Sequence, residues 1–209
     1  MKHSIIRPFD YSIIRLFDYS IILSALCAAG CFNEPEPAYK SVPAESRVYL
    51  SDKGLSDLAA ADLSKVGDYL NLDRNALTNV DPVAKLEGLK WLRLNDNRLA
   101  ALPDLKALAR LRRIYLKNNR FASVPETLKD LPSLTDVDLS GNPISEVPDW
   151  LAKKTGLKNL SFTQTMLRKL PDDLSAWQTL QSLQLGELNL PAEEMARIRA
   201  ALPKVAIVF

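Results

Sequence analysis

The sequence predicts an α/β fold: a curved solenoid with parallel strands on its concave face and short helices or turns on its convex face. First, pairs of apolar residues separated by one other residue recur along residues 46–209, as in Leu92-Arg-Leu94. Second, the period is nearly fixed, with the second apolar residue at positions 50, 72, 94, 116, 139, 162 and 185. Third, four consecutive units place an asparagine three positions later. Regular periods of this length indicate stacked structural repeats.

The apolar pairs and the asparagines each have a physical role in such a stack. Alternate residues of a strand point to one face, so both apolar residues of a pair point inward. One unit cannot bury that face alone, whereas stacked units form a continuous core. The chain then turns sharply, which leaves backbone groups without sheet partners. We expect a ladder of side-chain amides to bond these groups. Its members are Asn75, Asn97, Asn119 and Asn142.

Elements at the two ends of the array are predicted from local patterns. Residues 56–65 are rich in alanine and leucine, which favours a helix. Residues 192–201 follow Pro191 and place Met195, Ile198 and Leu202 at helical spacing, which predicts a second helix. A last strand is expected at residues 205–209, with Val205 and Ile207 in the two core positions.

The units resemble those of the leucine-rich-repeat family, whose motif is L-x-x-L-x-L-x-x-N-x-L. Four units between Leu70 and Val147 keep the asparagine and every apolar position of that motif. The resemblance covers residues 46–209 and implies about seven repeats followed by a C-terminal capping helix and strand. It implies a horseshoe arc that binds a partner rather than catalysing a reaction.

The first 45 residues have a different character. An uncharged run from Tyr19 to Phe32 follows three basic residues and has the length of the apolar region of a secretory signal. Small residues before Cys31 resemble the lipobox of bacterial lipoproteins. This resemblance implies a signal peptide over residues 1–30 and a lipidated Cys31. Residues 31–45 hold three prolines and are expected to form a flexible tether. An ordinary cleaved signal, an uncleaved anchor and a misassigned start remain alternatives.

Missing residue types narrow the function. The only histidine is His3, and the only cysteines are Cys27 and Cys31. Residues 32–209 therefore cannot supply Ser/His/Asp or Cys/His nucleophilic arrangements, or histidine and cysteine ligands for a metal. The formal net charge of +2 does not favour nucleic acid. We expect no enzyme activity, no cofactor and no metal.

The strand residues between the core positions are expected to face the concave side. In the first half of the array they are aromatic and basic, whereas in the second half they are small and polar. Aromatic and arginine side chains supply most of the energy of many interfaces. The predicted contact residues are Tyr49, Tyr69, Trp91, Arg93, Arg113, Tyr115 and Lys117. The alternative is that the aromatics shield one another and that Arg113 pairs with Asp136.

Three further positions carry expectations. Asp136 and Asp138 face the same side, as paired carboxylates do in glycosidases. We expect a shallow sheet to raise the pKa of neither carboxyl, which argues against catalysis. Trp177 aligns with Leu131 of an earlier unit and is predicted to be core, whereas Trp150 is predicted to be exposed on the convex side.

These observations together predict a lipid-anchored protein of the bacterial cell envelope, in the outer membrane, that recognises a protein partner. A glycan-binding surface protein, a purely structural envelope protein, and a non-secreted adaptor or effector are the alternatives, with secreted or cytoplasmic locations.

Overall fold

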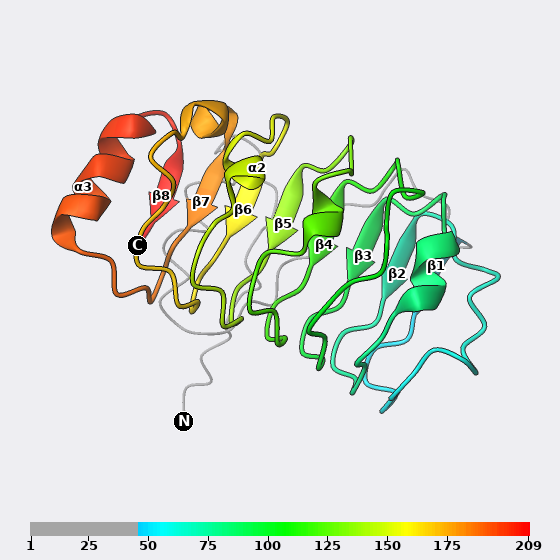
Figure 1. Cartoon of the computed structure of the whole chain (residues 1–209). Helices are drawn as coiled ribbons and strands as arrows, with labels where there is room; N and C mark the ends of the chain where they lie inside the picture. Colours follow the sequence, from blue (N-terminus) through cyan, green and yellow to red (C-terminus); the bar gives the residue numbers. More distant parts are fainter. Residues whose placement is uncertain (1–45) are drawn as a thin grey trace, which may run out of the picture. The chain divides into compact units, whose positions relative to one another are not determined.

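A computed structural model of the chain describes residues 46–209, which form a stack of repeats around one sheet (Figure 1). The sheet holds eight parallel strands over these residues, hydrogen-bonded in chain order. Their bounds are β1 Arg47–Tyr49, β2 Tyr69–Asn71, β3 Trp91–Arg93, β4 Arg113–Tyr115, β5 Asp136–Asp138, β6 Asn159–Ser161, β7 Ser182–Gln184 and β8 Ala206–Val208. The predicted solenoid is confirmed. The predicted signal peptide, lipidated Cys31 and tether lie outside the described residues.

The strands pair in the register that the repeat period predicts. Leu70 lies beside Leu92, and Leu92 beside Ile114, so each first core residue meets its counterpart in the next unit. The register of β8 is the exception, because Ile207 rather than Val205 lies beside Leu183. The step from Leu183 to Ile207 is 24 residues, against 22 or 23 in the earlier units, and this unit holds the longest helix of residues 46–209. A shift of two residues keeps every side chain on its predicted face.

Five short helical segments lie between strands over residues 46–209. They are η4 Asp81–Lys85, η5 Glu126–Leu128, α2 Asp149–Ala152, η6 Ser175–Thr179 and α3 Ala192–Ala201, where η denotes a 3₁₀ helix. The prediction of a helix at residues 192–201 is confirmed by α3. None of the described helices is both long and apolar enough to cross a membrane.

The predicted helix at residues 56–65 is wrong, because this segment forms turns. Two aspartates explain the difference. The Asp57 carboxylate accepts the Ala59 N–H at 2.9 Å, and the Asp62 carboxylate accepts the Ser64 N–H at 3.0 Å. Side chains of this kind offer the backbone a local partner that competes with the helix. Alanine-rich composition therefore does not decide the conformation here.

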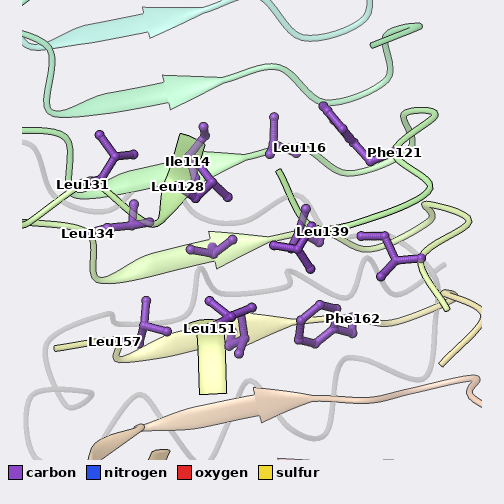
Figure 2. Close-up of a cluster of buried hydrophobic side chains, with 14 of the residues drawn as sticks. Ile114, Leu116, Phe121, Leu128, Leu131, Leu134, Leu139, Leu151, Leu157 and Phe162 are labelled. Atoms are coloured by element: carbon purple, nitrogen blue, oxygen red, sulfur yellow. The ribbon is translucent and has the colours of Figure 1, made fainter. Parts of the chain in front are cut away.

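Leucine side chains from every repeat merge into one continuous core. Figure 2 shows Ile114, Leu116, Leu139 and Phe162 along three successive strands, and each of these side chains is fully buried. A fully buried leucine stabilises a fold by about 1.5–3 kcal/mol relative to an exposed one. Trp177 is fully buried as predicted, and its indole N–H donates to the Leu151 carbonyl at 3.0 Å.

The two ends of the described array are packed differently. At the first repeat, Val48, Leu50 and Leu55 are only partly buried against the core. At the other end, α3 places Ile198 in the core. The buried Glu194 carboxylate accepts the Leu170 N–H at 2.8 Å, and its pKa is held below the ordinary value mainly by hydrogen bonds from Arg197. The helix thus closes this end with both apolar and polar contacts.

Asparagine side chains bind the turn of each repeat to the repeat before it. The Asn119 amide oxygen accepts the Leu99 N–H at 3.0 Å. Its amide nitrogen donates to the carbonyls of Leu94 at 2.9 Å and Leu116 at 3.0 Å. Asn75, Asn97 and Asn142 make the equivalent bonds. In the next unit, Thr165 makes one bond of the set, from its hydroxyl to the Phe162 carbonyl.

We predict that Asn119→Ala lowers the free energy of unfolding by about 2–4 kcal/mol, because buried backbone groups lose their hydrogen-bond partners. Asn189→Ala is the control, since Asn189 is exposed, and should change stability by no more than about 0.5 kcal/mol. Urea unfolding followed by circular dichroism measures both variants. Equal stabilities would contradict the structural role of the ladder.

Candidate functional site: the open face of the sheet

The face of the sheet opposite the core, called here the open face, carries two rows of side chains across the strands. The register aligns the first residue of each strand into one row and the third into another. The first row is Arg47, Tyr69, Trp91, Arg113, Asp136, Asn159 and Ser182. The second row is Tyr49, Asn71, Arg93, Tyr115, Asp138, Ser161 and Gln184. Residues some 22 positions apart in sequence thus become neighbours.

Six of the predicted contact residues are brought together by β1 to β4. The Tyr49 and Tyr69 rings have centroids 5.2 Å apart, and the Tyr69 and Trp91 rings 6.4 Å apart. The Arg113 guanidinium lies 4.0 Å from the Trp91 ring centroid, and that of Arg93 lies 5.3 Å from the Tyr115 ring centroid. Cation–π contacts of this kind orient both partners. Tyr49 is 44% exposed, whereas Tyr69 is 4% exposed.

Arg113 connects the aromatic half of the face to the polar half. Its Nε lies 3.6 Å from the Asp136 carboxylate. That carboxylate accepts a hydrogen bond of 2.6 Å from the Asn159 amide, and the Asn159 oxygen accepts one of 2.9 Å from Ser182. The first row is therefore one connected line from Tyr69 to Ser182. The contacts between aromatic rings and the Arg113–Asp136 pairing, both considered from the sequence, are present together.

Asp73 holds a second arginine and was not singled out from the sequence. It stands two residues after the last residue of β2, is 2% exposed, and accepts a 2.7 Å hydrogen bond from Arg93. Its second oxygen accepts the Asn95 N–H at 2.8 Å. The Asn95 side chain in turn accepts the Lys117 N–H at 2.9 Å. The sequence held a signal for this pair, because Asp73 follows one strand and Arg93 lies in the next, where the repeat period brings them close together.

Asp138 differs from the expectation that the sheet raises no carboxyl pKa. Desolvation by burial raises the pKa of Asp138 above its ordinary value. The Ser140 hydroxyl and N–H, which donate to its Oδ1 at 2.6 and 2.9 Å, act in the opposite direction, as do the charges of Lys117 and Arg93. The expectation was wrong, because desolvation outweighs these opposing interactions even though Asp138 is only half-buried by its neighbours on the sheet.

Trp150 is also placed differently from its prediction. It is half-buried, packs against the core, and donates its indole N–H to Glu126 at 2.9 Å. Trp150 thus contacts the convex segment of the preceding repeat, so a position that looks exposed within one repeat is partly covered by its neighbour. Within residues 46–209 no three acidic, histidine or cysteine side chains gather as metal ligands do.

We predict that the stability of the protein relative to an Asp138→Asn variant falls as the pH rises. Because the native pKa is raised above 3.8, the native state binds this proton more tightly than the unfolded chain does. The resulting stabilisation is present at low pH and is lost as the pH rises through the raised pKa. Asparagine keeps an acceptor for Ser140 and does not titrate. Unfolding measured over pH tests this, and a difference that increases with pH would contradict it.

Comparison with known proteins bears on the fold. Residues 87–144 match the family model described as leucine rich repeat. No curated protein matches the sequence. Among solved structures, an internalin from Listeria monocytogenes str. 4b F2365 is similar with a TM-score of 0.64 at 21% identity. The similarity covers 78% of this chain but only 46% of the internalin chain. Residues 46–209 thus fold as a leucine-rich-repeat solenoid.

Proposed function

We propose that this chain is a binding protein that recognises a protein partner through the aromatic half of its open face. The aromatic patch, as we call this surface, consists of Tyr49, Tyr69, Trp91, Arg93, Arg113, Tyr115 and Lys117. The observation that carries the proposal is the contact network that joins its rings and guanidinium groups. Tyrosine, tryptophan and arginine are the residue types enriched at interface hot spots.

The network supports binding because it fixes the side chains before a partner arrives. Ordering a long side chain at an interface costs about 0.5–1.5 kcal/mol. Arg93 is already held by Asp73 at 2.7 Å and lies over Tyr115, and Arg113 is held between Trp91 and Asp136. Preorganised side chains avoid part of this cost. The same contacts would also stabilise the sheet, which is the alternative role of the patch.

The site does not favour catalysis. Residues 32–209 contain neither histidine nor cysteine, which removes the usual nucleophile–base pairs. Desolvation raises the pKa of Asp138, but its Oδ1 already accepts hydrogen bonds from the Ser140 hydroxyl and N–H. A recognition surface accounts for the residue types better than a reaction centre does.

A glycan is the second candidate ligand, favoured by the exposure of Tyr49, which is 44% exposed beside Tyr69. Aromatic rings on an accessible face suit the apolar faces of sugars. A purely structural envelope role predicts that the patch tolerates substitution, and a non-secreted adaptor or effector predicts that Met1 is retained.

The predicted location is the bacterial cell envelope, with a lipid anchor at Cys31. The support is the order of features in the sequence: basic residues, an uncharged run, small residues before Cys31, and a proline-containing tether before residue 46. A lipoprotein needs such a tether to hold its folded domain away from the bilayer. The two features therefore support each other, and the open face would be presented to partners outside the membrane.

We predict that a photo-crosslinking amino acid replacing Tyr49 captures a specific protein in the native host. The same amino acid replacing Met166, which is 63% exposed and lies outside the patch, should not capture it. The partner is identified by mass spectrometry. Equal capture at both positions, or capture of glycan alone, would overturn the protein-recognition proposal.

We further predict that the Trp91→Ala/Tyr115→Ala variant binds the captured partner about 30-fold or more weakly, as expected for hot-spot residues. Gln184→Ala is the matched control, because Gln184 occupies the same row as Tyr115 in the polar half of the face. Isothermal titration gives both affinities, and thermal unfolding checks that each variant is folded. Unchanged affinity in the double variant would remove the patch from the interface.

We predict that the mature protein begins at an acylated Cys31 and partitions into the membrane fraction. Cys31→Ala should abolish acylation and the release of a mature chain starting at residue 31. Intact-mass spectrometry of both proteins in a bacterial host makes the comparison. A soluble wild-type chain that retains Met1 would contradict the predicted lipid anchor and favour the adaptor role. It would not bear on the solenoid fold.

A further inference from the structure

Charge is distributed unevenly between the two edges of the solenoid. The upstream edge is defined here as the segments that lead from the convex side into each strand from β2 to β8. These segments are residues 64–68, 85–90, 106–112, 129–135, 153–158, 178–181 and 202–205. They contain 11 basic and 3 acidic residues, whereas the rest of residues 46–209 contains 12 basic and 17 acidic residues. A nearly neutral chain is thus strongly polarised.

Backbone hydrogen bonds place Lys90, Arg112, Thr135 and Lys158 of this edge in a line. The Arg112 N–H donates to the Lys90 carbonyl at 2.8 Å, the Thr135 N–H to the Arg112 carbonyl at 2.8 Å, and the Lys158 N–H to the Thr135 carbonyl at 2.7 Å. Successive positions are therefore one strand spacing apart, about 4.8 Å. Figure 2 shows this edge on its left, where Leu134 and Leu157 precede the strands.

Most of the positive charge on this edge is directed to solvent. Arg110, Arg112 and Lys158 are exposed, and none of them forms an ion pair within residues 46–209. The ion pairs that do involve this edge in that part of the chain are Lys90 with Asp68 at 3.0 Å and Lys106 with Asp104 at 2.8 Å. These two contacts leave the excess of basic residues uncompensated.

We propose that the upstream edge docks on a membrane surface of anionic phospholipid headgroups. Lysine and arginine side chains are attracted to such a surface, and a row of them along one edge can contact it together. The seven segments contain no aromatic residue, so they lack the stacking platforms with which proteins hold single-stranded nucleic acid. The acidic excess elsewhere would be repelled, which fixes the orientation.

The choice of a lipid surface rests in part on the proposed lipid anchor. A tether of the 14 residues from 32 to 45 reaches at most about 45–50 Å when fully extended. An anchored domain would therefore stay within reach of the headgroups. Docking by an edge leaves both faces of the sheet free of the membrane, so the aromatic patch would remain accessible to a partner.

The expected size of the effect follows from the charge count. Each basic residue close to an anionic leaflet strengthens association by about fivefold at moderate salt. Removing three such residues should therefore weaken binding by roughly 100-fold at low salt, and by less as salt screens the interaction.

Vesicle co-sedimentation of the full chain tests the proposal, with Cys31→Ala as the background so that no acyl chain contributes. The vesicles are phosphatidylcholine alone, or phosphatidylcholine with about 30% phosphatidylglycerol. The test variant is Arg110→Gln/Arg112→Gln/Lys158→Gln. The matched control is Arg98→Gln/Arg120→Gln/Arg168→Gln, which removes three exposed charges outside the upstream edge. Binding through residues 1–30 would be common to all three proteins.

We expect the background protein and the control to prefer anionic vesicles and to lose that preference at high salt. The test variant should lose the preference at low salt as well. Equal effects of the two triple variants, or no preference for anionic vesicles, would overturn the proposal. Tighter edge-dependent binding to duplex DNA than to the anionic vesicles would also overturn it. Because all proteins in this test carry Cys31→Ala, its outcome does not depend on acylation. Acylation of Cys31 is tested separately by the intact mass of the wild-type protein.

Discussion

The structure depends on one constraint: the backbone must turn out of the sheet at every repeat without leaving buried polar groups unpaired. Asn75, Asn97, Asn119 and Asn142 meet this constraint by bonding backbone groups of their own repeat and of the repeat before. Each amide therefore closes its own turn and ties two units together. The regular stacking, and with it the alignment of rows on the open face, follows from this coupling.

The register of the strands makes residues that are one repeat apart in the sequence neighbours on the surface. Trp91, Arg113 and Asp136 are far apart along the chain, yet they occupy adjacent positions in one row because their strands pair in register. The same regularity gathers basic residues along the upstream edge without bringing them to the face. One scaffold thus presents an aromatic surface on its open face and a charged edge beside it, which allows separate roles for each.

The period alone was sufficient to predict the strands, the core and the side of the sheet on which each predicted contact residue lies. Features that depend on contacts between repeats were not predictable in this way. The hydrogen bond of the Trp150 ring with Glu126 and the pairing of Asp73 with Arg93 both arise from neighbours 20 to 24 residues away, and the raised pKa of Asp138 arises from desolvation in the assembled sheet. The turns at residues 56–65 and the shifted register of β8 arise where local polar bonds or a longer helix interrupt the repeat.

Because the two ends of the array are packed differently, we expect them to resist a pulling force differently. Val48, Leu50 and Leu55 in the first repeat are only partly buried, whereas Ile198 and Glu194 close the last repeats. In a stacked array each unit is held mainly by its neighbours. A force applied from the N-terminal side would therefore reach the weakest unit first and peel repeats one at a time. Tension applied from that side would be absorbed there, while the C-terminal repeats stay folded.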